Sequence, residues 1–282
     1  MAELSFGLSQ EPAIRAGAFA AVFVAMALWE RIAPRRALAA SRPVRWLNNL
    51  AVLALGAGLT RLVAPAAVVG AAIVAQRQGW GLFNLVAVPP LLAAAASILL
   101  LDLTVWAQHL AMHKVPALWR LHRMHHADVD IDVTTGLRFH PLEILLSLAI
   151  KAAAAVALGA PPLAVLAFEV LLNATAIFNH ANARLPPALD RVLRWILVTP
   201  DMHRVHHSWE RIETDSNYGF NLPWWDRLFR TYRAQPALGH ERMTIGLHEF
   251  RGSRELWIDR MLLQPLRQDR ERAGAARPTA TH

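Results

Sequence analysis

The sequence contains no cysteine, which excludes disulfide bonds, cysteine-ligated zinc and cysteine-ligated iron–sulfur clusters within this chain. It also lacks a GxGxxG motif and a P-loop, so any nucleotide or electrons that a reaction needs must come from another molecule. No Ser/His/Asp arrangement and no pair of acids suited to hydrolysis stands out. We therefore expect no bound flavin or nucleotide.

The chain has fewer acidic than basic residues: 21 Asp and Glu and 29 Lys and Arg give a formal net charge of +8. Much of the excess lies between Arg31 and Arg45 and in the C-terminal segment. No nucleic-acid-binding module accompanies this charge, so we expect no nucleic acid partner. The positive-inside rule and anionic lipid head groups account for it. The first residues lack a basic leader and a cleavage site, which predicts no signal peptide.

Hydrophobic residues make up 55% of the chain and form long blocks in its first two thirds. They predict an all-α integral membrane protein with about four to five transmembrane or hairpin helices. Arg61 and Pro65 interrupt the second block, so we expect a spanning helix up to Val63 and then a shorter apolar segment. The sequence GAPP at 159–162 predicts a hairpin between the last two blocks. The blocks comprise residues 14–32, 46–75, 89–108, 142–158 and 163–178.

The arginine-rich loop at 31–45 sets the expected topology. By the positive-inside rule this loop is cytoplasmic, which puts the N-terminus outside. The third block then returns the chain to the cytoplasm, and the hairpin ends on that same side. We expect a multi-pass protein of a bacterial inner membrane, with its polar C-terminal third facing the cytoplasm.

Nine of the 13 histidines fall into a regular pattern in HLAMH, LHRMHH, FNH and TPDMHRVHHS. Residues at i, i+3 and i+4 share one helix face, so each cluster can aim several imidazoles at one point, as a metal centre requires. Nine ligands exceed the four to six that one first-row ion takes, which predicts two metal ions. Iron, copper and zinc all suit nitrogen ligands, and a site at the membrane boundary, open to apolar substrates, favours iron. The predicted ligands are His109, His113, His122, His125, His126, His180, His203, His206 and His207.

Two intramembrane carboxylates share helix faces with these histidines. Asp102 precedes His109 by seven positions, and we expect it to hold a ligand imidazole. Glu169 precedes His180 on a face that also carries Asn173 and Arg184. The alternative for both acids is an ion pair with Arg or Lys, for example Lys151.

Further polar residues near the boxes are also candidates. His140, just before a helix start, is equally suited to bind a metal or to orient a ligand, and Asp201 lies within the third box. By contrast, His240, His248 and His282 fall outside the spacing pattern, so we expect surface or packing roles.

The stretches HLAMH, LHRMHH, DVTTGLRFHPLE, FNHANARLP, TPDMHRVHHS and DSNYGFNLPWWDRLFRTY resemble the fatty acid hydroxylase/sterol desaturase superfamily of membrane histidine-rich di-iron oxygenases. The resemblance covers roughly residues 101–232. It implies transmembrane helices with a cytosolic helical cap that encloses two iron ions (Fe2+/Fe3+) bound by the nine histidines. It also implies O2-dependent oxidation of a lipid C–H bond, with electrons from a ferredoxin, a cytochrome b5-like protein or a reductase.

This resemblance divides the chain into three parts. Residues 1–100 hold N-terminal transmembrane helices, 101–235 form the catalytic domain with the hairpin at 142–179, and 236–282 form a cytosolic tail that frays from about Arg267. Some branches of the superfamily place a second histidine where this chain has Arg184. A tenth ligand is therefore missing, or is supplied by His140 or water.

The sequence leaves the substrate and the outcome of the reaction open. Sterol, hopanoid, fatty acyl, sphingoid and carotenoid chains all suit an apolar site, and no motif separates hydroxylation from desaturation. An alternative within the enzymes is cleavage of an alkyl-ether lipid. A non-enzymatic membrane metal-binding or transport protein is another, but it predicts ligands near the bilayer midplane rather than at one end.

Overall fold

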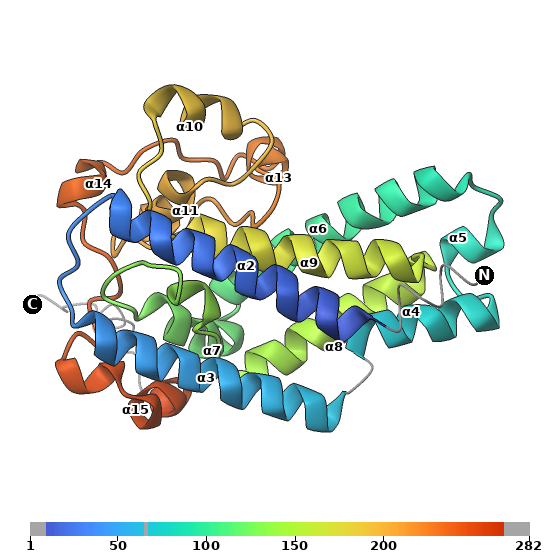
Figure 1. Ribbon diagram of the computed structural model, residues 1–282, viewed down its shortest axis with the longest axis horizontal. Coiled ribbons are helices and arrows are strands. Elements are labelled where there is room, and N and C mark those ends of the chain that lie inside the picture. Colours follow the sequence, from blue (N-terminus) through green and yellow to red (C-terminus); the bar gives the residue numbers. More distant parts are fainter. Residues whose placement is uncertain (1–9, 65–66, 268–282) are drawn as a thin grey trace, which may run out of the picture.

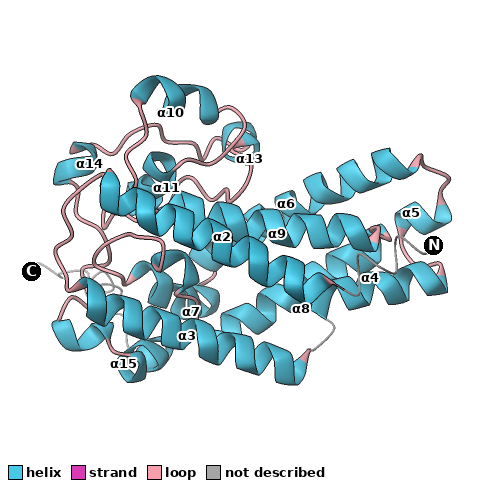
Figure 2. Ribbon diagram, viewed as in Figure 1, coloured by secondary structure: helices cyan, strands magenta, loops and turns pink. Residues whose placement is uncertain are grey.

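The structure, a computed structural model, describes residues 10–64 and 67–267. Within these ranges the chain forms helices and loops without a strand (Figure 2), and its only extended pairings are isolated bridges at Pro34–Ala183 and Ser208–Ile245. The predicted all-α class is confirmed. The α-helices are α2 (Glu11–Ile32), α3 (Arg42–Val63), α4 (Ala67–Gln78), α5 (Leu82–Leu85), α6 (Pro90–Lys114), α7 (Pro116–His126), α8 (Pro141–Leu158), α9 (Pro162–His180), α10 (Pro187–Leu193), α11 (Pro200–His206), α12 (Arg211–Thr214), α13 (Trp224–Leu228), α14 (Gly239–Arg242) and α15 (Ile258–Leu263), and the 3-10 turns are η1 (Thr135–Leu137), η2 (Ser253–Leu256) and η3 (Gln264–Leu266).

Among the described residues, five segments are long and apolar enough to cross a membrane, which confirms the predicted four to five. They are α2, the stretch Arg42–Leu85, α6, α8 and α9. As expected, α3 ends at Val63 and a shorter apolar helix, α4, follows it. Helices α6 to α11 each begin at a proline, because the first helical position needs no backbone N–H donor.

The predicted hairpin is present as α8 and α9. Gly159 ends α8 in the left-handed conformation, at φ +63°, which glycine adopts without steric cost. A Cβ on Gly81 would lie 2.1 Å from the backbone nitrogen of Gly159, so the loop between α4 and α5 packs directly on the hairpin turn.

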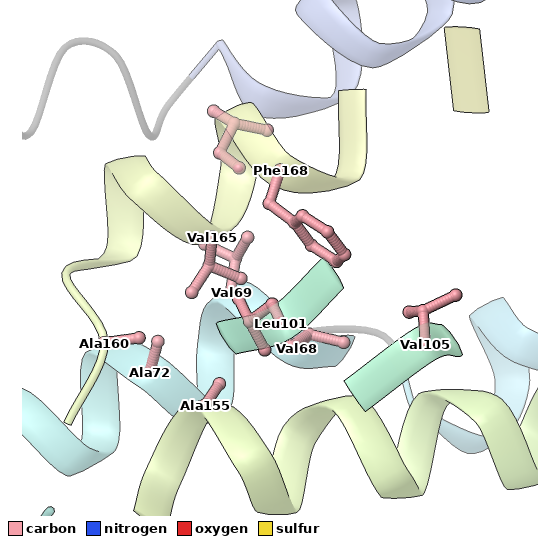
Figure 3. Packing of buried hydrophobic residues seen from close by; sticks show 10 residues of the cluster. Val68, Val69, Ala72, Leu101, Val105, Ala155, Ala160, Val165 and Phe168 are labelled. Carbon is pink, nitrogen blue, oxygen red and sulfur yellow. The ribbon is translucent and has the colours of Figure 1, made fainter. Parts of the chain in front are cut away.

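A core of small and branched side chains holds α4, α6, α8 and α9 together (Figure 3). The alanines allow the helices to approach closely, and the valines fill the space between them. The buried members are Val68, Val69, Ala72, Leu101, Val105, Ala155, Ala160, Val165, Leu166 and Phe168.

The helices that follow α9 gather at one end of the bundle, together with α7. Figure 1 shows α7, α10, α11, α14, α15 and the loop between α2 and α3 in its left half, whereas α5 and the turn between α8 and α9 lie at the right end. We call the first of these the cap end. Helices α6 and α9 both run towards it, and each carries predicted ligands in its last turns.

Buried ion pairs fasten α3 to the loop that follows α7. The guanidinium of Arg45 donates to both carboxylate oxygens of Asp128, at 2.7 and 2.9 Å, and to Asp132 at 2.5 Å, and all three side chains are fully buried. Burial alone raises the pKa of Asp128, but Arg45 outweighs it and holds that pKa below its usual range. This network fixes the backbone directly after the second histidine box.

Residues after 236 pack onto the cap end as far as the structure describes them. Helix α15 contacts α3, and η3 contacts α7, where Arg123 donates to the carbonyl oxygen of Gln264. The fraying expected from about Arg267 concerns residues 268–282, which lie outside the described part of the chain.

Candidate metal centre

All nine predicted histidines come together, and every one is buried. They form two groups, and in each group one ring nitrogen per histidine lies within 4.8 Å of the others. The first histidine group comprises His109, His113, His122, His126 and His206, and the second comprises His125, His180, His203 and His207.

Each His-x-x-His-His box serves both groups rather than a single point. On α7, His122 and His126 are four residues apart and belong to the first group, while His125 turns to the second. The box at α11, a helix N-capped by Thr199, is divided too. His203 and His207, four residues apart, belong to the second group, while His206 belongs to the first. His126 and His207, from opposite groups, stack with ring centroids 4.6 Å apart. The two groups are therefore direct neighbours.

Hydrogen-bond acceptors orient the imidazoles of the first group. The Nδ1 atom of His109 lies 2.7 Å from the carbonyl oxygen of Tyr218, and that of His206 lies 2.7 Å from the carbonyl oxygen of Ser216. An acceptor at Nδ1 places the ring proton there and leaves a lone pair on Nε2.

A carboxylate plays the same part for His122. The Nδ1 atom of this histidine donates to Glu143 Oε1 at 2.6 Å, and both side chains are buried. Sequence reasoning missed Glu143. Its position in the first turn of α8, three residues after the candidate His140, was the available signal.

The resulting lone pairs converge. His109 Nε2 lies 3.1 Å from His122 Nε2 and 3.0 Å from His206 Nε2. In neutral rings whose proton is on Nδ1, none of these three nitrogens has a proton to donate. Such an arrangement is repulsive unless a cation lies between the nitrogens. Two nitrogens bound to one ion at about 2.1 Å, with a right angle between the bonds, lie about 3 Å apart. The first group therefore fits a transition-metal ion.

The second group has the same character. His180 Nδ1 donates to the carbonyl oxygen of Ala176 at 2.7 Å, and its Nε2 faces the Nε2 atoms of His125 at 3.2 Å and His203 at 3.1 Å. Both ring nitrogens of His207 are buried without a hydrogen-bond partner in the described part of the chain. Buried polar atoms of this kind are costly unless a ligand satisfies them.

Electrostatics favour the neutral form in several of these imidazoles, which is the form that binds metals. Burial, reinforced by the neighbouring imidazoles, lowers the pKa of several histidines well below the ordinary value for histidine. Among those outside the membrane-spanning segments, this holds for His125, His126, His203, His206 and His207.

The prediction that Asp102 holds a ligand imidazole is wrong. Its carboxylate accepts hydrogen bonds from Asn221 Nδ2 and Trp225 Nε1, each at 2.8 Å. Seven residues of helix, about 10 Å of rise, separate Asp102 from His109, and the partners of Asp102 come from the loop before α13 and from α13 itself. Asp102 thus anchors this loop and not an imidazole.

Glu169 follows the alternative prediction, because it pairs with Lys151 at 3.2 Å and also with Arg15. It does not reach His180. Asn173 and Arg184 are exposed and belong to neither histidine group, so the expected role for this face of α9 is wrong apart from His180 itself.

The remaining candidates contribute to the cap in other ways. His140 caps α8 by accepting from the backbone N–H of Leu142 at 3.2 Å and lies outside both groups. Asp201 pairs with Arg35 at 3.1 Å and with Arg204. His240 is buried, with Nε2 3.5 Å from Asp201.

The histidines set aside by the spacing pattern also stay outside the groups where they are described. His248 stacks on Trp209 at 4.2 Å. His282 lies beyond the described residues.

Two half-exposed phenylalanines lie against the imidazoles. Phe139 stacks on His125 with ring centroids 4.3 Å apart. Phe220 lies 4.9 Å from His109 and 5.7 Å from His203, and it also packs against the core of the membrane helices. An apolar surface therefore connects the histidine groups with the apolar bundle.

Comparison with known proteins agrees with this site. Residues 94–231, just under half of the chain, match the family described as fatty acid hydroxylase. The match spans α6 to α13 and includes every histidine of the two groups. The resemblance to the fatty acid hydroxylase/sterol desaturase superfamily is thereby confirmed.

Relatives with assigned activities align over about half of the chain. Ornithine lipid hydroxylase OlsE from Rhizobium tropici is 30% identical over 139 residues, which cover 49% of this chain and 41% of that protein. Alkylglycerol monooxygenase from Homo sapiens is 32% identical over 139 residues, 49% and 29% of the two chains. Cholesterol 25-hydroxylase-like protein from Danio rerio is 31% identical over 140 residues, 49% and 54%. The matched region is thus little more than half of each relative at most. No solved structure matches the chain.

Proposed function

We propose that this protein is a membrane oxidoreductase that uses O2 and two externally supplied electrons to hydroxylate an unactivated C–H bond of a lipid. The observation that carries the proposal is the pair of adjacent, buried, all-imidazole groups whose Nε2 lone pairs converge at 3.0 to 3.2 Å. Five histidines in one group and four in the other suit one metal ion each.

We propose iron in both positions. Imidazole ligands suit iron as well as zinc and copper, and the family relationship favours iron. Bound iron supplies the activation of O2 and the one-electron steps that oxidation of a C–H bond requires. The remaining work falls to the protein itself, which holds the metals, positions the lipid and excludes water.

Residues around the histidines hold the rings in place. Glu143 and the carbonyl oxygens of Ala176, Ser216 and Tyr218 each face an Nδ1 atom. They direct the opposite nitrogen towards the centre of its group. Burial of all nine rings keeps bulk water away, which protects a reactive centre from side reactions.

A groove between α6 and α8 is the proposed path for the lipid chain. Its volume is about 600 Å3, and it is lined mostly by apolar side chains. Both helices are candidate membrane spans, so a lipid tail can enter from the bilayer. The lining residues run along α6 to Gln108, which directly precedes His109 of the first histidine group. The lining comprises Leu100, Leu103, Thr104, Ala107, Gln108, Ile150, Ala154, Ala157 and Leu158.

The likeness to alkylglycerol monooxygenases supports a second candidate, cleavage of an alkyl-ether lipid. Hydroxylation of the carbon beside an ether oxygen gives a hemiacetal, which breaks into an aldehyde and an alcohol. The same oxygen insertion therefore serves both candidates, and only the position of the attacked carbon differs. Desaturation, in which a second hydrogen is removed instead of hydroxyl transfer, is a further outcome of the same centre.

We also propose a cytoplasmic active site in a bacterial inner membrane, with the N-terminus outside. The arginine-rich loop at 31–45 supports this orientation because it lies at the cap end (Figure 1). There Arg35 pairs with Asp201, and Arg36 donates to the carbonyl oxygen of Met243. The positive loop and the histidines are therefore on the same side. Clustering of the ligands at one end also speaks against a transporter, whose site lies near the midplane.

The test begins with the metal content of full-length protein purified in detergent after iron-replete growth. We expect about two irons per chain, lost in a His206→Ala, His207→Ala variant and retained in His248→Ala. Lipids extracted from cells supplied with 18O2 should carry labelled hydroxyl groups with the wild type but not with the double variant. Zinc alone would contradict the oxidation, and a protein without metal would refute the site.

A further inference from the structure

Trp119 is a half-exposed aromatic residue in contact with the first histidine group. Its ring centroid lies 5.0 Å from that of His113, 5.5 Å from that of His126 and 6.3 Å from that of His122. Trp119 belongs to α7, which starts beyond the end of α6 at Lys114 and lies outside the candidate membrane spans. One side chain therefore connects three of the proposed ligands with the surface of the cap end.

Other aromatic rings at the histidines differ from Trp119. Phe139 is also partly exposed and outside the candidate membrane spans, but it stacks mainly on His125 of the second group and reaches only His122 of the first, at 6.2 Å. Tyr218 contacts the first group but is fully buried, and Phe220 packs against the core of the membrane helices. The indole ring is also larger than a benzene ring, so it spans more of the distance between the surface and the imidazoles. Because electron-transfer rates fall steeply with distance, a carrier bound over Trp119 would reduce the centre efficiently.

Exposed cations lie close to His113, the imidazole nearest to Trp119. Lys114 ends the preceding helix and pairs with Asp215, which also lies 3.6 Å from Arg211 and from His113 Nδ1. The carboxylate of Asp215 is only 21% exposed, whereas Lys114 is 52% and Arg211 is 75% exposed. The outward face of this cluster is therefore positive.

A second pair of cations lies next to Trp119 in α7 and at the C-terminal end of the described chain. Arg120, the next residue in α7, donates to the carbonyl oxygen of Arg267 at 3.2 Å. Arg267 is 41% exposed and pairs with Glu255, which is 17% exposed. Here too the acid lies deeper than the base. Arg120 itself is partly exposed. We call the set Lys114, Arg120, Arg211 and Arg267 the basic surface.

We infer that Trp119 is the point at which electrons enter the first histidine group, and that the basic surface binds an acidic one-electron carrier protein. The inference rests on the proposed function, which requires electrons from outside the chain. Each reduced carrier loses one electron and one oxidised metal ion gains it, so two carriers reduce the pair. Hydroxylation then consumes these two electrons, two protons and one O2, and yields the hydroxylated lipid and water.

Reduction kinetics without O2 or lipid test this inference apart from turnover. Full-length, iron-loaded, oxidised protein in zwitterionic nanodiscs is mixed anaerobically with a reduced plant-type [2Fe–2S] ferredoxin as the acidic probe. Sodium dithionite, a small reductant that needs no docking surface, serves as the comparison. Two single variants, Trp119→Leu and Trp119→Phe, test the electron entry point. One double variant, Arg120→Glu with Arg211→Glu, tests the docking surface. The matched control is Arg191→Glu on exposed α10.

For Trp119→Leu we expect a saturating rate of reduction by ferredoxin at least about tenfold below wild type, with unchanged iron content and an unchanged rate with dithionite. Trp119→Phe, which preserves the packing, should fall between the two. The double arginine variant should lose about tenfold or more in the second-order rate at low salt. That difference should shrink as salt screens the charges, while Arg191→Glu should behave like wild type.

Ferredoxin rates that stay at the wild-type value in Trp119→Leu would overturn the electron entry point. An effect of the double arginine variant no larger than that of Arg191→Glu would overturn the docking surface. The docking surface would also be overturned if the double arginine variant lost binding to phosphatidylglycerol vesicles but kept its rate with ferredoxin. The basic surface would then bind lipid head groups. Failure of dithionite to reduce the iron-loaded wild type would refute the proposed function instead.

Discussion

The hydrogen bond between Glu143 and His122 offers the sharpest test of how the first histidine group is held. The bond is 2.6 Å long, joins two buried side chains and involves a carboxylate. A bond to a charged group contributes about 1.5–3 kcal/mol. Loss of a partner that orients a metal-bound histidine lowers metal affinity about 10–100-fold, which is about 1.4–2.7 kcal/mol. The two estimates agree, although they come from different kinds of measurement.

We expect Glu143→Leu to weaken one of the two metals about 100-fold. Glu143→Gln should lose about tenfold, because its amide oxygen still accepts the bond but carries no charge. Glu213→Gln is the matched control, since Glu213 is equally buried in the cap but accepts from the backbone N–H of Ala237 at 2.6 Å and touches no imidazole.

The assay measures iron retained per chain against increasing concentrations of a chelator, with thermal unfolding recorded for each variant. Glu143→Leu should lose one metal at a chelator concentration about 100-fold lower than wild type does. Retention of the second metal and the unfolding temperature should change little. Wild-type retention of both metals in Glu143→Leu would show that His122 is held without this carboxylate. Equal losses in Glu213→Gln would show a general effect of removing a buried acid.

Two further predictions concern the scaffold and the groove. Arg45→Met leaves the buried carboxylates of Asp128 and Asp132 without their cation and should destabilise the protein by about 3–5 kcal/mol; a melting temperature like that of Arg191→Glu would contradict this. Ala154→Trp fills the groove between α6 and α8 and should lower turnover of long-chain lipids at least about tenfold while iron content stays normal. Ala153→Trp, whose side chain is exposed and does not line the groove, is its control, and equal activity of the two variants would exclude the groove as the lipid path.

Local patterns carried much of the prediction. Block lengths near 20 residues identified the membrane helices, because a span must satisfy its backbone hydrogen bonds internally over a bilayer of given thickness. Gly159 marked the hairpin turn, since its left-handed conformation suits glycine. The histidine spacing identified the nine residues that the fold gathers, because residues three and four apart share a helix face.

Side-chain contacts between residues far apart in the sequence could not be predicted from local spacing. Helical periodicity placed Asp102 and Glu169 on the faces of His109 and His180, but a shared face does not state what lies opposite. Asn221, in the loop before α13, and Trp225, in α13, follow Asp102 by 119 and 123 residues, and Arg15 precedes Glu169 by 154 residues. Glu143 reaches His122 only because α8 packs beside α7.

The sequence by itself thus determined the helical class, the membrane segments and the set of clustered histidines, all of which depend on spacing along one helix or on the length of one apolar run. Tertiary structure alone decided that each box divides between two groups and that Glu143 and three carbonyl oxygens orient the rings. It also decided that Trp119 links one group to the surface. These features depend on how α6, α7, α9 and α11 meet, and packing between helices is set by side chains far apart in the chain.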